Sequence, residues 1–250
     1  MCYAPAYHEG EAYSIDNAAV SSYNIGMDIT KAKAFIFDMD GVVFDSEVNW
    51  LNADRAADKK FNTGFDPGVR AECCGRDEKS VRAFLRSIKP DLDVDSYREY
   101  IIDSVRRAED RDGAPLKRGI SELVALLKVL NIKTALATSS RRERVIKLFD
   151  KAGLNADDMF GAVLTCNDVT HAKPDPEIFL KAAERIGVAP NAAIVLEDSP
   201  NGLLAAVRGG FTPIMIVDLI EPPPDMVRDG LVHYPDVYPI IEQLLKGDNR

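Results

Sequence analysis

The chain has 250 residues, of which 46% are hydrophobic and 28% charged, and its formal net charge is -9. These values describe an ordinary globular protein, long enough for one large domain or a core with an inserted subdomain. The negative charge argues against nucleic acid or an anionic membrane as a partner, and no stretch approaches the roughly 18 apolar residues of a membrane span. A small anionic substrate is not excluded, because a few cations or one bound metal can dominate a cleft.

Residues 1–30 contain no Lys or Arg, so the basic start of a secretory signal and the Arg-rich face of a transit peptide are both missing. We expect a poorly ordered lead-in without chemistry. The cysteines, Cys2, Cys73, Cys74 and Cys166, form no C-x-x-C pair. This pattern favours reduced thiols and a cytoplasmic protein.

Strand and helix periodicities alternate after the lead-in, with one long interruption. The first predicted strand is the apolar run at 33–38. From residue 47 to about 111 the pattern is helical only, most clearly at 47–60, 76–88 and 95–111, with turn-prone stretches between the helices.

The alternation of helices and strands then resumes and continues to residue 219. Helices are predicted at 120–130, 141–153, 175–187 and 199–210, and strands at 133–138, 162–165, 192–198 and 213–219. Such alternation gives a doubly wound, Rossmann-like α/β fold with helices on both faces of a parallel sheet. The all-helical block is then an inserted cap at 45–115, and the core comprises 31–44 and 116–250.

Ligands of such sheets bind at the carboxyl ends of the strands. Asp38 and Asp40 stand there, two residues apart and directly before Gly41. Residues at this spacing on an extended chain point to the same side, and two such carboxylates raise each other's pKa unless a cation lies between them. Mg²⁺ suits a site with few carboxylates. A calcium loop or a capping turn is the alternative, although Gly41 comes too early for an EF-hand.

Three further segments carry polar residues that could belong to the same cleft. Hydroxyls and backbone N–H groups of Thr138, Ser139 and Ser140 form either a phosphate cradle or a helix N-cap. Lys173 lies among prolines before a helix, where a fixed ammonium binds phosphate or the lysine is only a helix lead-in. The acidic pair at 197–198 ends a very apolar strand and needs a partner, such as a shared metal or the following helix N-terminus.

These four segments together identify a resemblance. "DMDGV" (38–42), "TSS" (138–140), "KPDP" (173–176) and "LEDSPNG" (196–202) follow the order and spacing of the haloacid dehalogenase superfamily. The chain most resembles its β-phosphoglucomutase-like branch, which has a small helical cap, over roughly residues 33–245.

The resemblance implies a role for each matching residue. Asp38 is the nucleophile that forms an aspartyl-phosphate, and Asp40 is the general acid and base. Mg²⁺ is held by Asp38, the backbone carbonyl of Asp40 and Asp198, with Glu197 as a further ligand or a supporting acid. The remaining matches line the site: Thr138 and Lys173 bind the transferred phosphoryl group, beside Ser139, Ser140 and Asn201. Dehalogenases lack the second aspartate, so Asp40 favours phosphoryl transfer.

The cap is expected to choose the substrate. Arg76 resembles the substrate loop of the family's caps, or is a solvated arginine that opens a helix. Trp50 either faces the cleft or anchors the small core of the cap.

The expected function is a Mg²⁺-dependent phosphatase acting on a small phosphorylated metabolite, such as a sugar phosphate. The mutase of this branch has a histidine in its first cap helix, whereas the histidines here are His8, His171 and His233. A sugar phosphomutase is therefore the alternative, and a non-catalytic phosphate-binding protein is a weaker one. A dinucleotide enzyme would need G-x-G-x-x-G after the first strand, which is absent. The oligomeric state stays open.

Overall fold

The computed structural model describes residues 28–73 and 78–248. They divide into two compact units, one made of residues 48–111 and the other of residues 28–47 and 112–248. Each unit is described by itself. The helical unit lies within the predicted insertion at 45–115, and residues 1–27 of the predicted lead-in lie outside the described residues.

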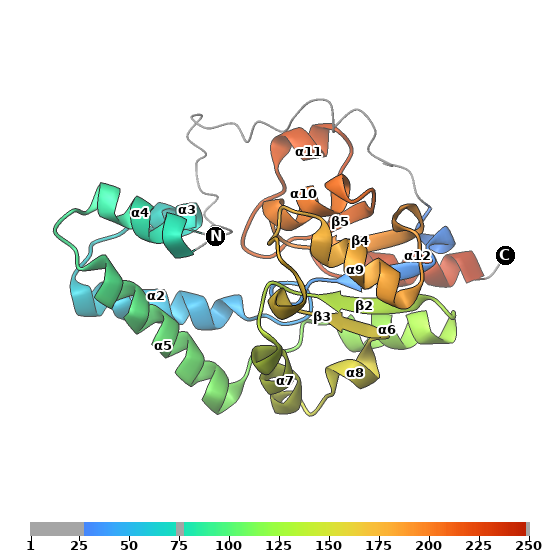
Figure 1. Cartoon of the computed structure of the whole chain (residues 1–250), viewed down its shortest axis with the longest axis horizontal. Helices are drawn as coiled ribbons and strands as arrows, with labels where there is room; N and C mark the ends of the chain where they lie inside the picture. Colours follow the sequence, from blue (N-terminus) through green and yellow to red (C-terminus); the bar gives the residue numbers. More distant parts are fainter. Residues whose placement is uncertain (1–27, 74–77, 249–250) are drawn as a thin grey trace. The chain divides into compact units, whose positions relative to one another are not determined.

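The larger unit is built on a six-stranded sheet in which every neighbouring pair is parallel, in the order β3-β2-β1-β4-β5-β6 (Figure 1). The strands are β1 (Ala34–Phe37), β2 (Lys133–Ala137), β3 (Ala162–Leu164), β4 (Ala193–Glu197), β5 (Thr212–Ile216) and β6 (Val232–Tyr234). The predicted doubly wound α/β fold is confirmed, with strand bounds shifted by a few residues.

Helices cover both faces of this sheet, and β1 shows why (Figure 1). Phe35 and Phe37 join one buried cluster with α6 (Ile120–Val129), α7 (Arg142–Lys151) and α12 (Tyr238–Asp248). Ala34 and Ile36 join the other with α9 (Glu177–Ile186) and α10 (Pro200–Arg208). Because successive side chains of a strand alternate between faces, a fully apolar strand fills two cores at once. β1 is thus a central, fully buried strand.

Several elements have no counterpart among the predicted ones. They are short, or follow residue 219, where no element was assigned: η1 (Ile29–Lys31), α8 (Ala156–Met159), η2 (Cys166–Asp168), η3 (Pro190–Ala192), α11 (Pro224–Arg228), β6 and α12. η1 falls at the end of the predicted lead-in. Asp28 caps it by accepting a hydrogen bond from the Thr30 backbone N–H at 3.1 Å, and Ile29 is buried in the core.

The described residues of the smaller unit form helices joined by turns, without a strand. Its helices are α2 (Glu47–Phe61), α3 (Pro67–Cys73), α4 (Glu78–Ile88) and α5 (Val94–Asp112). α3 is a seven-residue helix that the periodicity did not predict. A separate apolar cluster holds the unit together, with Ala57, Leu85 and Ile101 fully or almost fully buried. This unit therefore has a core of its own.

The two chain segments that connect the units run side by side where they leave the sheet unit. The backbone N–H of Asp45 donates to the carbonyl of Pro115 at 2.8 Å, and that of Lys117 donates to Val43 at 2.9 Å. Phe44 and Leu116 form an antiparallel bridge between these bonds. The insertion thus begins and ends on paired backbone.

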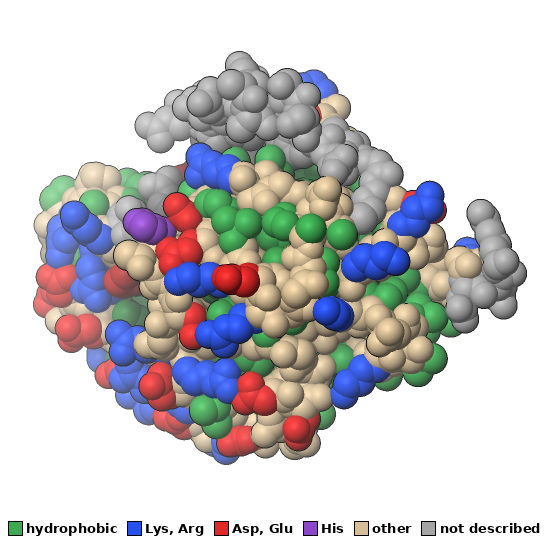
Figure 2. All heavy atoms as spheres, turned by 45° about the vertical axis from the view of Figure 1, so that its right-hand side comes forward, with side chains coloured by type: hydrophobic (Ala, Val, Ile, Leu, Met, Phe, Trp, Pro, Cys, Tyr) green, Lys and Arg blue, Asp and Glu red, His purple; other side chains and the backbone are tan. Residues whose placement is uncertain are grey.

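The surface carries both signs of charge. Figure 2 shows Lys and Arg side chains interspersed with Asp and Glu on the face drawn, without a large basic area. Among the described residues, no helix combines the length and hydrophobicity that a membrane span requires.

Candidate active site

The register of the central strands brings the predicted strand-end residues to one edge of the sheet. Phe37 of β1 pairs with Leu136 of β2 and with Leu196 of β4. The residues that follow, Asp38 and Glu197 among them, therefore leave the sheet at the same level. The backbone N–H of Asp38 continues the ladder by donating to Leu196 at 2.9 Å.

A buried ammonium joins two of these carboxylates. Lys173 Nζ donates to Asp38 Oδ1 at 2.5 Å, to Glu197 Oε1 at 2.7 Å and to the Ala137 carbonyl at 3.2 Å. It also lies 4.7 Å from the ring centre of Phe179. The side chains of Lys173, Asp38 and Glu197 are 7%, 9% and 1% exposed, so this ion triad is screened little by water. The lysine leaves Asp38 Oδ2 as the oxygen that a substrate can meet.

The triad sets the protonation of its members. Burial raises the pKa of Asp38 to about 7, with Lys173 acting in the opposite direction and Glu197 and Asp40 adding to the rise. Burial by itself lowers the pKa of Lys173, but Asp38 and Glu197 more than offset this, and its pKa lies above the usual value. The lysine is therefore a permanent cation beside a carboxyl that titrates near neutrality.

Glu197 supports the site from behind. Its Oε1 accepts from Lys173, and its Oε2 accepts from Asp198 N at 2.9 Å, Ser199 N at 2.8 Å and Ser199 Oγ at 2.9 Å. A Cβ on Gly202 would lie 1.8 Å from Oε1, so α10 can approach only because residue 202 is glycine. Of the two predicted roles for Glu197, this geometry fits the supporting acid, because the protein already fills both oxygens.

Asp40 accepts hydrogen bonds from four donor atoms of three residues, two of which, Arg144 and Ser46, the sequence analysis missed. Arg144 Nη2 and Ser46 Oγ donate to Oδ1 at 2.7 and 2.5 Å. Arg144 Nη1 and Ser140 Oγ donate to Oδ2 at 2.7 and 3.0 Å. Since a carboxylate offers about four lone-pair positions, the side chain of Asp40 is saturated. Only its backbone carbonyl stays available to a metal.

Arg144 also determines the charge of Asp40. Burial acts to raise the pKa of Asp40, but the guanidinium of Arg144 and the hydroxyls of Ser46 and Ser140 bring that pKa below its usual value. The sequence does contain a signal for Arg144, because it lies in the first turn of the helix that follows a strand end. Arginines also occupy positions 141 and 142, however, and the sequence does not show which of the three points inward.

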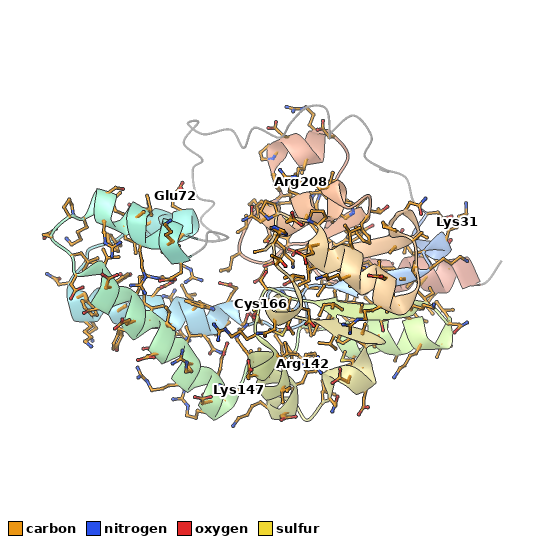
Figure 3. All side chains as sticks on the ribbon, viewed as in Figure 1. Lys31, Glu72, Arg142, Lys147, Cys166 and Arg208 are labelled. Atoms are coloured by element: carbon orange, nitrogen blue, oxygen red, sulfur yellow. The ribbon has the colours of Figure 1, made fainter. Side chains whose placement is uncertain are left out.

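The predicted phosphate cradle is tied to its neighbours by backbone bonds. Thr138 is buried, and its Oγ1 accepts from the Ser140 N–H at 3.0 Å. The Ser140 carbonyl accepts from Cys166 N at 3.1 Å, so the loop is fixed against η2, which Figure 3 shows with Cys166 labelled. Ser139 is exposed between them. Thr138 thus has a fixed position at the strand end.

Asp198 packs against the loop that carries Asp40. A Cβ on Gly41, whose φ is +76°, would lie 2.0 Å from Asp198 Oδ2, so only glycine fits this position. Burial and the charges of Glu197 and Asp38 raise the pKa of Asp198 well above its usual value. Asp38 and Asp198 are thus two buried carboxyl groups with raised pKa values, and a bound cation would favour their ionised forms.

Comparison with known proteins identifies the family. A model of haloacid dehalogenase-like hydrolases matches residues 32–210. The chain belongs to this family. The predicted resemblance and the prediction of an enzyme are thereby confirmed.

Two relatives and one solved structure illustrate the similarity. A phosphorylated carbohydrates phosphatase of Thermotoga maritima is 29% identical over 182 residues, which cover 72% of this chain and 82% of that protein. Hexitol phosphatase B of Escherichia coli K12 is 31% identical over 192 residues, with coverage of 73% and 82%. A β-phosphoglucomutase structure from Clostridium difficile has a TM-score of 0.64 at 20% identity, covers 88% of this chain and all of that chain, and shares the fold.

The donor set fits the divalent cation that this family resemblance implies. The carboxylates of Asp38 and Asp198 and the carbonyl of Asp40 are hard oxygen donors, which Mg²⁺ prefers. A nearby carboxylate oxygen, Oδ2 of Asp218, is buried and has no hydrogen-bond partner among the described residues. A buried anionic oxygen of this kind is what a hydrated cation would satisfy.

A second set of metal-type side chains lies nearby in sequence. Atoms of His171, Asp175 and Glu177 lie within 4.8 Å of one another. Glu177, however, accepts from Thr170 N and His171 N at 3.0 and 2.8 Å and pairs with Lys181 at 2.6 Å. These bonds fix the loop that leads to Lys173, which is a sufficient role for the group.

The predicted substrate contacts outside the strand ends have different outcomes. Trp50 is half-buried on α2, packs against the apolar cluster of the helical unit and lies 5.9 Å from the guanidinium carbon of Arg98. This position fits the predicted anchoring role, and substrate contact stays a prediction. Arg76 lies outside the described residues. Asn201 is half-buried in the first turn of α10, directly after the strand end that carries Asp198.

Proposed function

We propose that the chain is a divalent-cation-dependent phosphatase that hydrolyses a small phosphorylated carbohydrate through an aspartyl-phosphate. The observation that supports this most directly is the buried carboxylate of Asp38, held by Lys173 at 2.5 Å with one oxygen left for reaction. A second acid, Asp40, stands two residues further on. This pair provides a nucleophile and a proton carrier in one loop.

The first half of the reaction transfers the phosphoryl group to the protein. Asp38 Oδ2 attacks phosphorus and the ester P–O bond breaks. Asp40, whose ionised form Arg144 favours, must first take up a proton from solvent, which it then gives to the leaving oxygen. Lys173, which remains charged, stays beside Asp38 and reduces its repulsion of the phosphate dianion. Asp40 must first exchange at least one of its four donors for the leaving oxygen.

The second half restores the enzyme. Water attacks phosphorus of the aspartyl-phosphate, Asp40 takes the proton from this water, and the acyl phosphate P–O bond breaks to release inorganic phosphate. Thr138 would donate to phosphoryl oxygens, a role supported by the position of its hydroxyl at the end of β2 beside the end of β1. When bound, Mg²⁺ offsets the negative charge of the phosphoryl group, with Asp38, Asp198 and the Asp40 carbonyl holding it.

The substrate class is supported by the two relatives named for phosphorylated carbohydrate and hexitol phosphates. The predicted alternative, a sugar phosphomutase, would require a proton-handling residue in the helical unit. The described histidines, His171 and His233, both belong to the sheet unit. Hydrolysis is therefore favoured over the mutase reaction. The cytoplasmic location and the absence of a nucleic-acid partner stay predictions.

A product assay tests the proposal. The chain is incubated with a panel of hexose, hexitol and glycerol phosphates in Mg²⁺ or in chelator, and inorganic phosphate is measured. We expect release in Mg²⁺ only, and trapping of a hydroxylamine-labile phosphoprotein that Asp38→Asn abolishes. Formation of glucose 6-phosphate from β-glucose 1-phosphate with little free phosphate would instead establish the mutase. Turnover by Asp38→Asn would refute the assigned nucleophile.

A further inference from the structure

An ion pair that the proposed reaction does not use lies beside the metal-binding loop. Lys117 precedes α6, and its Nζ donates to Asp218 Oδ1 at 2.6 Å and to the Gly41 carbonyl at 2.7 Å. Asp218 follows β5, so it leaves the same edge of the sheet as the catalytic strands. The two side chains are only 17% and 13% exposed. The pair therefore connects the end of β5 to the loop after β1.

The second oxygen of Asp218 is the unusual feature. Oδ2 is buried and has no hydrogen-bond partner among the described residues, whereas Oδ1 is bound by Lys117. A buried acceptor without a donor is destabilising, because the hydrogen bonds that it made to water are not replaced. The polar groups of a native protein are normally satisfied, so an orphaned carboxylate oxygen at a site edge indicates a missing donor.

The contacts around Gly41 show where this oxygen lies. Asp198 packs directly on Gly41, whose carbonyl is bound by the same lysine that holds Asp218. The charge of Asp218 also contributes to the raised pKa of Asp198, after burial, Glu197 and Asp38. Asp218, which follows β5, thus neighbours the acids that would hold the cation.

We infer that Asp218 is an outer acid of the divalent-cation site, whose Oδ2 accepts a hydrogen bond from hydration water of the cation. Mg²⁺ gives up its water reluctantly and is usually held by one or two carboxylates and several waters. Outer carboxylates that orient such ligands commonly contribute about 10- to 100-fold to metal affinity. The inference rests on the cation in the proposed function, and assigns Asp218 as a positioning residue.

Replacing Lys117 provides a second test, because its expected effect on Mg²⁺ binding differs from that of replacing Asp218. Asp218→Asn removes the acceptor charge and leaves an unbalanced ammonium near the cation. Lys117→Met leaves the carboxylate in place and removes the competing cation. If Asp218 serves the metal, the first change weakens Mg²⁺ binding and the second does not. If the pair is merely a tie on the Gly41 loop, both changes weaken binding alike.

The test is a calorimetric titration of Mg²⁺ into the full chain without substrate. Asp225→Asn is the control, because Asp225 is an exposed acid on α11 that pairs with exposed Arg228. We expect about 10- to 100-fold weaker binding for Asp218→Asn, with unchanged binding for the control and equal or tighter binding for Lys117→Met. Thermal melting in chelator reports whether each variant is folded.

Each outcome decides a separate point. Unchanged affinity in Asp218→Asn, or equal weakening in the two pair variants, overturns the role of Asp218. If Asp218→Asn fails to fold, Lys117→Met decides: weaker binding overturns the inference, and equal or tighter binding supports it. Absence of Mg²⁺ binding by the unaltered chain would instead refute the cation in the proposed function.

Discussion

Replacing Lys173 by methionine tests the ion triad most directly. Methionine keeps most of the hydrocarbon volume of the lysine and removes the ammonium. In the variant, Asp38 and Glu197 face one another in a buried site without the cation that bonds them at 2.5 and 2.7 Å. The protein must then neutralise, hydrate or move these carboxylates, and each response reduces stability.

The structure supplies the magnitude. Removing one partner of a buried ion pair destabilises a protein by about 3–5 kcal/mol, because the remaining charge is left without compensation. The contact of the ammonium with the Phe179 ring, at 4.7 Å, adds about 0.5–2 kcal/mol. We therefore expect a loss of at least about 3 kcal/mol at pH 8 in chelator. The loss should shrink at pH 5, where Asp38 binds a proton.

The assay is urea unfolding at pH 5 and pH 8, with Lys181→Met as the matched control. Lys181 lies on α9, is 42% exposed and pairs with Glu177 one helical turn away. Exposed pairs of this kind contribute little to stability, because water screens their charges. Mg²⁺ should restore part of the stability of Lys173→Met, since a cation on Asp38 replaces some of the missing charge.

Equal stability of the two methionine variants at pH 8 would refute the reasoning. It would mean that solvent or local relaxation, rather than the lysine, neutralises Asp38 and Glu197. A loss of the same size at both pH values would also contradict it, because the cost is assigned to the ionised form of Asp38.

Three further predictions concern the loop and its acids. Gly41→Ala should reduce turnover at least about a hundredfold, because the new Cβ would meet Asp198 Oδ2 at 2.0 Å and displace it. Arg144→Lys, which keeps the charge but loses the two-pronged contact with Asp40, should lower kcat about 10- to 100-fold with little change in KM. In chelator, stability should fall as pH rises from 4 to 7, since the folded state, with the pKa of Asp38 raised to about 7, binds protons that the unfolded state has released.

Matched variants separate these effects from general damage. Gly64→Ala also places a side chain at positive φ, +65°, but nothing lies within 4 Å of the new Cβ, so activity should survive. Arg142→Lys alters the same turn of α7 at an arginine that pairs with Asp157, and should leave kcat unchanged. Asp38→Asn should flatten the pH dependence of stability. An inactive Gly64→Ala, an equally slow Arg142→Lys or an unaltered pH slope would contradict the respective prediction.

Much of the fold follows from the sequence because strong periodicities are local. The apolar runs that become β1 and β4 and the long helices of the insertion were predicted within a few residues of their observed bounds. Three-residue β6 and seven-residue α3 carry too few turns or alternations to be detected by period. Their existence depends on neighbours that the sequence pattern does not show.

The residues of the candidate site were likewise predicted only in part. Asp38, Lys173 and Glu197 were predicted to share one cleft, and the structure brings them into one hydrogen-bonded triad. Arg144 and Lys117 were missed, because each acts through tertiary contacts with a loop far away in sequence. Charged residues near helix starts are common, and only packing shows which of them turn inward.

The paired backbone at the base of the insertion has a practical consequence. Since Asp45 N and the Pro115 carbonyl are 2.8 Å apart, the two cut ends of an excised insertion would already meet in hairpin register. A tight turn of two residues can close such a gap. The helical segment can therefore be exchanged for that of a relative at these two adjacent backbone positions. The exchange would neither lengthen nor strain the sheet that receives the new segment.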